Sequence, residues 1–481
     1  MFRRPEPAAA QRRQLRGLLS AASETRWGEE YAFGELQDYR DFAARVPVLT
    51  RPRLQELTDE LKSGAEDLAW PGQVRRFAVS AGTTGEGRHL PVTRERLRSD
   101  RQFMRMVTLS HLRRYPNVLR LAGPHLSLPG NVEEYGGWTA GEISGYTALQ
   151  APAWLRWLQV LDPEEAVRMS FRHKMELIRR RAADLSPRVI VSAPSWLLTL
   201  FQDILEDTGA GCLREIWPRL RLLVCGGVAL SSYRGHLVRL IGPPEPRFIE
   251  TYGASEGYFA WSDDPERGDL LLAVDNGIFY ELIPDPLPQA EAAGIQQTVP
   301  LWEAETGRAY GLVVSTNAGL WRCPVNDIVS FTSLDPPRLV VRGRVNEMLD
   351  DYGEALHLHE AEEALKEAAA ELGLEETPGP FTILAYLPER GAPRHRWFLR
   401  FGRTPHRGLL EKLAGVMDRR LQKVNRHYAT RRESGALEAP EMRSIRQSDI
   451  RRWLEVTGRD RAQGKLPRVI GKDDADILQS L

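Results

Sequence analysis

Apolar residues in the first half of the chain gather in short runs, each followed by a glycine-bearing turn or a helical pattern. Runs of this kind occupy residues 189–193, 220–225 and 247–251, and a helical pattern covers residues 196–206. Strands that alternate with helices predict an α/β domain whose sheet is at least partly parallel. Ligands of such sheets gather at the carboxyl ends of the strands, so the turns that follow these runs are the first places to look for chemistry.

An earlier segment repeats this order of strand, turn and helix. Residues 76–80 read as a strand, a loop rich in Gly and Thr follows, and Thr93 is a plausible N-cap for the helix behind it. Leu97, Met104, Val107 and Leu112 lie roughly at helical spacing after that cap, which predicts one buried face for the helix.

Beyond residue 270 the pattern changes to strands in quick succession. These are predicted at residues 270–274, 278–283, 311–316, 328–332 and 339–341. Pro- and Gly-rich turns separate them, which indicates a smaller antiparallel sheet or a β-barrel-like subdomain.

A last segment mixes helices and strands again. Helices are predicted at residues 359–372, 408–424 and 449–455, and strands at 381–386 and 397–401. The predicted fold class is therefore α/β, with a large N-terminal domain over residues 1–345 and a small α+β C-terminal domain over residues 346–481.

Composition and charge exclude several classes of protein. Apolar residues make up 42% and charged residues 27% of the 481 positions, which is the balance of a globular protein rather than of a disordered or fibrous one. The 65 basic residues match the 65 acidic ones, so nucleic acid and membrane surfaces are not expected partners. No apolar stretch approaches the ~20 residues that span a bilayer. A monomer is the default expectation.

Cysteine usage points to a reducing compartment. Cys212, Cys225 and Cys323 fit no metal-binding spacing, and an odd number cannot all pair within the chain. We expect reduced thiols in a cytoplasmic protein, with Cys225 and Cys323 buried.

The loop that follows the strand at residues 76–80 carries the sharpest chemical signal. Its sequence is SAGTTGEGR, in which glycines let successive backbone N–H groups face one concavity and hydroxyls add neutral donors. Arg88 adds a planar positive charge that suits phosphate. The loop is not a Walker A motif. A phosphate-binding loop and an ordinary surface turn are both open on composition alone.

Four further positions could carry chemistry. Glu256, in the turn YGASEG after the strand at residues 247–251, could hold Mg²⁺ or be a solvated turn residue. Asp327 could accept the hydroxyls of a ribose or form an Asx turn. Arg344 and Lys465 are the other two candidates. The ordinary alternative is a surface salt bridge for Arg344 and a solvated loop for Lys465. None of these positions is decisive alone, and it is their order and spacing along the chain that favour a functional role.

Several longer segments resemble one known family. They read WPG at residues 70–72, FAVSAGTTG at 77–85, APSWLL at 193–198, EIWPRLRLLVCGGV at 215–228, FIETYGASEGYFAW at 248–261, DNGIFYELIP at 275–284, STNAGLWR at 315–322, RGRVNEMLDDYGEAL at 342–356 and GKLPR at 464–468. Together they cover nearly the whole chain. The sequence resembles the acyl-acid amido synthetases of the auxin-responsive GH3 type and their bacterial relatives, within the adenylate-forming superfamily.

The resemblance implies ATP and Mg²⁺ as cofactors, and a mobile C-terminal domain. It assigns residues Ser80, Gly82, Thr83, Thr84 and Gly85, with Arg88, to the phosphates. Gly227 and the turn residues Tyr252, Gly253, Ala254 and Ser255 are assigned to the nucleotide, and Glu256 to the metal. It assigns Asp327 to the ribose, Arg344 to the nucleotide near the hinge, and Lys465 to the reacting carboxylate and α-phosphate.

The sequence departs from the family pattern at a few of these positions. Ala81 stands where relatives usually carry Ser, Arg88 where they carry Lys, and Asn326 where Gly commonly precedes the aspartate. The hinge neighbourhood at residues 345–347 is also atypical. Glu256, Asp327 and Lys465 are retained, and we therefore expect ATP use to be retained.

The implied reaction has two steps. A carboxylic acid is adenylated to acyl-AMP with release of pyrophosphate, and an amine, in particular an amino acid, then takes the acyl group to form an amide. Glu256 and Lys465 are the expected catalytic residues. Aromatic residues are the candidates for the walls of the acyl pocket, namely Trp138, Tyr146, Trp196, Tyr258 and Phe259.

Two other functions compete with this one. In the first, the acyl group passes to a thiol of coenzyme A or of a carrier protein. In the second, the chain binds ligand without catalysis, which the departures at Ala81, Arg88 and Asn326 would suit.

Overall fold

The structure is a computed structural model of the chain, which divides into two compact units. It describes residues 6–79, 88–117, 121–286, 297–345, 349, 352, 354, 356–386, 388, 393–459 and 466–480. The first unit comprises Met1–Leu230 and His236–Val341, and the second comprises Ser231–Gly235 and Arg342–Leu481. The boundary between residues 345 and 346 that the sequence suggests stays a prediction.

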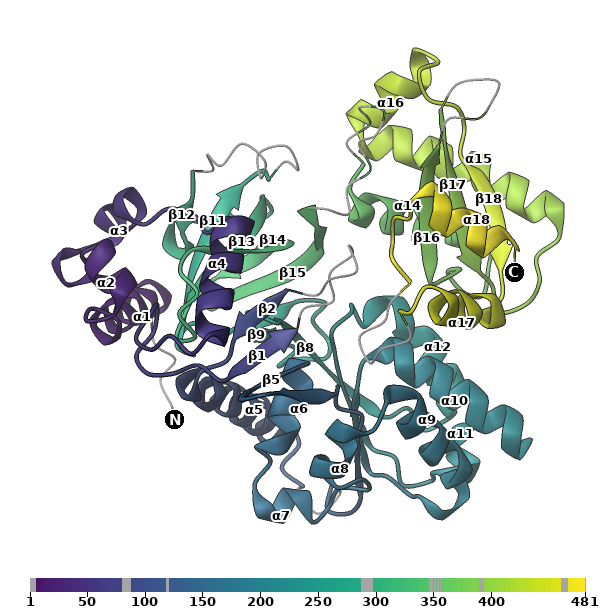
Figure 1. Cartoon of the computed structure of the whole chain (residues 1–481). Coiled ribbons are helices and arrows are strands. Elements are labelled where there is room, and N and C mark those ends of the chain that lie inside the picture. The colour runs from purple at the N-terminus through teal and green to yellow at the C-terminus, as the bar shows by residue number, and fades with distance from the viewer. Residues whose placement is uncertain are drawn as a thin grey trace. The chain divides into compact units, whose positions relative to one another are not determined.

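One long mixed sheet forms the centre of the first unit (Figure 1). Its strands follow the order β12-β11-β13-β14-β15-β10-β9-β8-β7-β6-β3. Their bounds are β3 His125–Ser127, β6 Val189–Ser192, β7 Leu222–Gly226, β8 Arg247–Ala254, β9 Gly257–Trp261, β10 Leu270–Leu272, β11 Ile278–Pro284, β12 Val299–Pro300, β13 Ala309–Thr316, β14 Cys323–Leu334 and β15 Pro337–Arg344.

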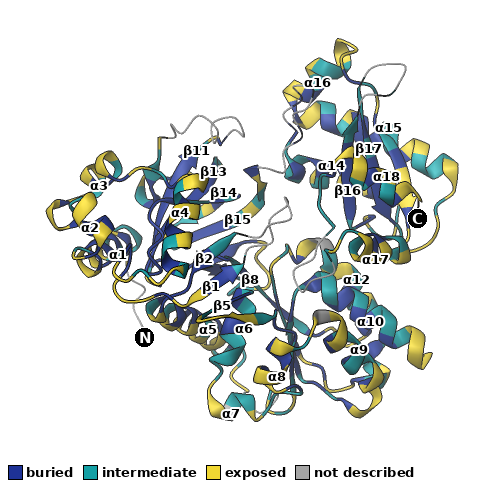
Figure 2. Cartoon of the chain, viewed as in Figure 1, coloured by how far each residue is buried: buried dark blue, intermediate teal, exposed yellow. Residues whose placement is uncertain are grey.

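The pairing of the strands changes from parallel to antiparallel along this sheet. Strands β3, β6, β7 and β8 pair in parallel, whereas β9 pairs antiparallel with β8 and begins the antiparallel half. The predicted β-barrel-like subdomain is not confirmed, because the strands after residue 270 continue the same sheet in the described residues. Figure 2 shows these strands mostly in the colour of buried residues, as the apolar runs of the sequence require.

A smaller sheet lies in the N-terminal third of the chain. Its order is β2-β1-β5-β4, with β1 and β5 parallel and the outer strands antiparallel to them. The bounds are β1 Arg76–Val79, β2 His89–Pro91, β4 Val132–Tyr135 and β5 Trp138–Gly141. Strand β1 runs into the Gly/Thr-rich loop, most of which lies outside the described residues.

Helices accompany both sheets of the first unit. They are α1 Pro7–Ala21, α2 Arg26–Glu30, α3 Tyr39–Arg45, α4 Arg51–Lys62, α5 Arg94–Arg114, α6 Ile143–Leu149, α7 Ala153–Arg156, α8 Pro163–Arg168, α9 Phe171–Arg180, α10 Pro194–Thr208, α11 Leu213–Ile216 and, crossing into the second unit, α12 Ser231–Ile241. No helix within the described ranges is both long enough and apolar enough to cross a membrane.

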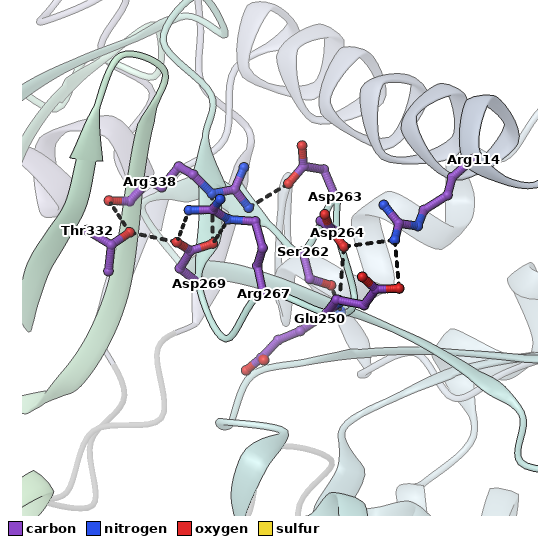
Figure 3. A network of polar contacts seen from close by, with 10 residues as sticks. Arg114, Glu250, Ser262, Asp263, Asp264, Arg267, Asp269, Thr332 and Arg338 are labelled. Atoms are coloured by element: carbon purple, nitrogen blue, oxygen red, sulfur yellow. Dashed lines mark hydrogen bonds and ion pairs between the residues drawn. The ribbon is translucent and has the colours of Figure 1, made fainter.

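Helix α5 begins where the sequence predicts. The Thr93 hydroxyl accepts a hydrogen bond from the backbone N–H of Arg96 at 3.0 Å, which confirms the predicted N-cap. Phe103 lies on the buried face of the helix. At the other end, Arg114 forms an ion pair with Asp264 at 3.2 Å (Figure 3).

A network of charged side chains joins the antiparallel strands beyond this helix end (Figure 3). Asp269 accepts hydrogen bonds from Arg267 at 3.0 Å and Arg338 at 2.7 Å, and Arg338 also contacts Asp263 at 2.7 Å. These hydrogen bonds, led by the one from Arg267, hold the pKa of Asp269 well below its usual range.

The second unit has an α+β core of its own. Its strands β16 Phe381–Tyr386, β17 Arg394–Arg400 and β18 Glu441–Ile445 form a sheet in that order. The helices are α14 Leu358–Glu371, α15 Arg407–Val424, α16 Arg426–Glu433, α17 Gln447–Val456 and α18 Lys472–Ser480. Trp397 is fully buried in this core, and His395 Nε2 contacts Glu354 Oε1 at 2.8 Å.

Candidate functional site

The turn at residues 252–257 lies where the sheet changes from parallel to antiparallel. Strand β8 is parallel to β7 and antiparallel to β9, so the turn occupies the carboxyl end of the last parallel strand. Gly253 is required here, because an added Cβ would lie 2.8 Å from the carbonyl oxygen of Gly257. The pairing also shifts between Tyr252 and Gly253, which leaves Phe259 as an extra residue in β9.

Glu256 is buried in this turn rather than solvated. Its carboxylate Oε1 lies 3.7 Å from Nη2 of Arg88, the residue predicted to contact phosphate. The pair is too long for a direct hydrogen bond, but each charge partly offsets the other. The structure therefore brings together two residues that the sequence assigned to the metal and to the phosphates.

Helix α5 holds the backbone of the same turn. Arg96 Nη1 donates to the carbonyl oxygen of Glu256 and lies 3.4 Å from that of Ser255. Arg96 Nε also pairs with Asp100 at 2.8 Å, and both side chains are almost completely buried. Burial is the largest influence on Asp100 and raises the pKa of its carboxyl, which Arg96 counteracts.

Asp327 lies within β14, in a bulge. The sequence instead placed it at the start of a strand, because the predicted strand covers residues 328–332. Residue Gly311 of β13 faces Ile328, and Val313 faces Pro324, so three residues of β14 oppose the single residue Leu312. A bulge of this kind redirects the side chains that it contains.

The residue before Asp327 explains one departure from the family pattern. Asn326 has a φ of +67°, in the left-handed region that L-residues rarely adopt. Glycine enters this region without a steric penalty, and asparagine is among the side chains that tolerate it best. Asn326 therefore fits the conformation of a position where relatives commonly carry Gly.

A tyrosine of the Glu256 turn contacts Asp327. The Tyr252 hydroxyl donates a hydrogen bond to Oδ2 of Asp327 at 2.9 Å, and both residues are buried. This contact links the strand that leads into the Glu256 turn to the bulge that carries Asp327, although β15, β10 and β9 stand between β14 and β8 in the order of the sheet.

Cys323 begins β14 close to this site and is not suited to nucleophilic chemistry. Burial and the nearby negative charge of Glu256 raise the pKa of its thiol. Burial also raises the pKa of Cys225. Both thiols are buried as predicted, and both are kept protonated.

Some predicted residues cannot be placed beside this turn. Ser80, Gly82, Thr83, Thr84 and Gly85, and also Lys465, lie outside the described residues. Arg344 ends β15 and belongs to the second unit. Gly227 follows β7 with a φ of +84°, and a Cβ added there would meet no described atom within 4 Å. These roles stay predictions.

The aromatic residues predicted for the acyl pocket lie in different surroundings. Tyr258 stacks on Phe103 at 5.2 Å, and its hydroxyl is 3.3 Å from that of Thr147 on α6. Phe259 is fully buried against Tyr252. Of this group, Tyr258 lies nearest in sequence to the turn while remaining partly exposed.

The other three candidates lie on separate elements. Tyr146 hydrogen-bonds through its hydroxyl to Thr139 at 2.8 Å, and Trp138 stacks on Tyr135 at 4.6 Å. Trp196 lies in the first turn of α10. Four of the five belong to or pack against one hydrophobic cluster of the first unit, namely Trp138, Tyr146, Tyr258 and Phe259, and the role of all five as a pocket wall stays a prediction.

Three family domains match the chain. The GH3 family N-terminal domain matches residues 4–175, the GH3 family central domain residues 271–344, and the GH3 family C-terminal domain residues 359–474. The chain belongs to the GH3 family. This confirms the family that the sequence resembles.

Curated GH3 proteins are related to the chain at low identity. A probable indole-3-acetic acid-amido synthetase of Oryza sativa subsp. japonica, GH3.2, is 27% identical over 58% of this chain and 49% of its own length. The chain thus spans about half of that relative. The jasmonoyl–L-amino acid synthetase JAR4 of Nicotiana attenuata is 22% identical over 98% of this chain and 92% of its own length.

Solved structures confirm the GH3-type fold. The GH3.15 acyl acid amido synthetase aligns with a TM-score of 0.79 at 15% identity, over 98% of this chain and 94% of that one. A 2-hydroxyisobutyryl-CoA ligase in complex with 2-HIB-AMP aligns with a TM-score of 0.61 at 14% identity, over 99% and 92% of the two chains. At these identities the likeness concerns the fold alone.

Sequence reasoning missed the buried pair Arg96 and Asp100 of this GH3 chain. The signal was present in the spacing, because the two residues stand four apart on the face that also carries Phe103 and Val107. A charged pair within an apolar stripe needs internal partners. Here those partners are each other and the carbonyl groups of the turn.

Proposed function

We propose that the chain adenylates an organic acid with ATP and transfers the acyl group to an amine, in particular an amino acid. Membership of the GH3 family and the relationship, over nearly the full length of both chains, to a jasmonoyl–L-amino acid synthetase support this proposal. The observation that carries it is the hydrogen bond from Tyr252 to Asp327, because it joins the predicted nucleotide turn to the predicted ribose ligand.

The proposed chemistry makes a poor electrophile reactive. A carboxylate oxygen attacks the α-phosphorus of ATP, the bond to the bridging oxygen breaks, and pyrophosphate leaves with the electron pair. The amine nitrogen then attacks the acyl carbon, AMP leaves, and the amine loses a proton to a base that we do not assign. Catalysis in such reactions comes mainly from positioning and charge stabilisation.

Residues of this chain fit the expected roles. Asp327, held by Tyr252, is suited to accept the ribose hydroxyls, and Arg88 supplies positive charge beside Glu256. We assign Lys465 to the reacting oxygens and Arg344 to the nucleotide on the basis of the sequence. The acid would lie near Tyr258, with the other predicted aromatic residues as further candidates.

The donor set around Glu256 suits Mg²⁺. The described residues contain no cluster of three or more His, Cys, Asp or Glu side chains that could hold a metal, so a Mg²⁺ ion would take most of its ligands from phosphate and water. That is its usual preference. When bound, the ion would offset the negative charge of the phosphates, and Glu256 would supply one carboxylate oxygen.

Exchange of labelled pyrophosphate into ATP, dependent on an added acid, tests the first step. We expect Lys465→Ala to lower the exchange rate far more than ATP affinity, with the exposed Lys472→Ala as the matched control. A loss equal in rate and affinity, or no loss, would remove Lys465 from the chemical step.

Asp327→Ala tests the nucleotide site. We expect a higher KM for ATP with a smaller change in kcat, because the ribose contact belongs to binding. Asp327→Asn keeps an acceptor for Tyr252 while removing the charge, and it should fall between the wild type and the alanine variant. An unchanged KM in both variants would contradict the ribose role.

The acceptor is tested separately. With the adenylate formed, amino acids should consume it and coenzyme A should not. Consumption by coenzyme A alone would favour the thiol-transfer alternative. Absence of any exchange over a broad panel of acids would favour a protein that only binds. A monomer in the cytoplasm remains part of the proposal.

A further inference from the structure

A cavity of about 610 Å³ lies in the first unit, between helices α5, α6 and α8 and the smaller sheet. Helix α5 contributes Arg94, Leu97, Arg98 and Arg101 to its wall. Helix α8 contributes Glu164, Val167 and Arg168. The volume is sufficient for a small organic ligand. None of the residues that the sequence assigned to the nucleotide lines it.

The rim of the cavity is strongly basic. Five exposed arginines line it, namely Arg76, Arg94, Arg98, Arg101 and Arg168. Within the described residues, Arg98 pairs with Glu95 at 2.9 Å, whereas the other four form no ion pair. Of the two glutamates in the lining, Glu164 is already paired with Arg156 at 2.7 Å. The rim therefore carries an excess of positive charge.

Part of the inner wall of the cavity is apolar, beside the polar residues Thr139 and Gln150. Leu97, Val132, Leu149 and Val167 contribute aliphatic surface, and the buried ring of Tyr146 lies among them. An arginine rim above an aliphatic wall matches a ligand with one anionic end and one apolar end. The guanidinium group binds carboxylate and phosphate with two parallel hydrogen bonds, so it suits either head group.

The cavity is separate from the turn that carries Glu256. An α-helix has 3.6 residues per turn, so Arg94, Leu97, Arg98 and Arg101 share one side of α5. Arg96 and Asp100, which hold the turn, lie on the opposite side and are buried. A ligand in the cavity would contact the same helix from its other face.

We propose that this cavity binds an amphiphilic organic anion, with a carboxylate or phosphate at the arginine rim and an apolar chain against the inner wall. The site is additional to the nucleotide site of the proposed function and does not depend on that function. Of the five aromatic residues predicted for the acyl pocket, Tyr146 alone lines this cavity, and its hydroxyl is already bonded to Thr139. Helix α5 would connect the two sites, because its opposite face fixes the Glu256 turn.

Calorimetric titration of the full chain with octanoate and with octyl phosphate tests the site. We expect at least one of these probes to bind, and binding to weaken about tenfold or more in the double variant Arg94→Gln/Arg101→Gln. The matched double variant Arg105→Gln/Arg219→Gln removes two exposed arginines outside the cavity and should bind like the wild type. Which probe binds more tightly identifies the head group.

Two further probes separate the two halves of the ligand. Inorganic phosphate and 1-octanol each lack one half, and both should bind about tenfold more weakly than octyl phosphate. Leu149→Ser should weaken octyl phosphate binding and leave that of inorganic phosphate unchanged.

Equal affinity of the cavity double variant and the wild type would overturn the proposal, as would inorganic phosphate binding as tightly as octyl phosphate. A wild-type protein that binds the probes in the cavity but shows no pyrophosphate exchange with any acid would instead count against the proposed function. The two failures are therefore distinguishable in the same protein preparation.

Discussion

The two faces of helix α5 use the same type of residue in opposite ways. On the inner face, Arg96 is almost completely buried, pairs with Asp100, and holds the carbonyl groups of the turn at Ser255 and Glu256. On the outer face, Arg94 and Arg101 are exposed at the rim of a cavity and form no ion pair within the described residues.

Burial, rather than charge, accounts for the difference. A buried guanidinium must satisfy its donors internally, so it fixes the groups that accept from it. An exposed guanidinium is hydrated and remains available to a ligand. The inner arginine is therefore expected to govern stability and the shape of the turn, and the outer arginines to govern attraction of an anion.

The largest effect is expected from Arg96→Met. Removing one partner of a buried ion pair leaves the other charge buried alone, which costs about 3–5 kcal/mol. Urea denaturation should show this loss of unfolding free energy, and pyrophosphate exchange should fall because the turn loses its anchor. Arg105→Met on the same helix should change stability by less than about 0.5 kcal/mol.

A second variant separates stability from the position of the turn. Arg96→Met combined with Asp100→Leu removes both charges, and such replacements are often neutral or stabilising. The double variant should regain stability while exchange stays low. Recovery of full exchange would show that Arg96 acts only on stability and does not position the turn.

An intermediate effect is expected from Tyr252→Phe, which removes the other connection of the turn. A hydrogen bond to a charged group contributes about 1.5–3 kcal/mol, so the KM for ATP should rise about tenfold or more. The dependence of pyrophosphate exchange on ATP concentration measures this. An unchanged KM would mean that α5 alone places the turn.

The smallest effect, of opposite sign, is expected from Arg101→Gln. Like charges three or four positions apart on a helix repel by about 0.2–0.5 kcal/mol, and Arg101 lies three positions from Arg98 and four from Arg105. The variant should be slightly more stable than the wild type at low salt. The gain should vanish near 1 M salt, where charges are screened within ~3 Å.

Much of the fold followed from local pattern. The strands predicted at residues 189–193 and 247–251 occur as β6 and β8, and the N-cap at Thr93 is present. Short strands such as β3 and β9 were missed, because three to five residues carry too little periodicity. The continuity of the sheet was also missed, because pairing between distant strands leaves no mark on local spacing.

In the candidate site, too, local motifs were visible in the sequence, whereas contacts between distant segments were not. Glu256 and Asp327 were found from their motifs, but the bulge that places Asp327 depends on the register between β13 and β14. The role of Arg96 depends on the packing of α5 against the turn, which sequence spacing alone does not reveal.

Strand β8 has hydrogen-bonded neighbours along both edges, β7 on one and β9 on the other. Its amide hydrogens can exchange with deuterated solvent only when one of these neighbours separates from it. The backbone at Tyr252 is therefore expected to exchange slowly, together with the interior of the sheet. The strand that leads into the turn at residues 252–257 is therefore expected to lose its form only when the surrounding sheet opens, and not by the fraying of a loop.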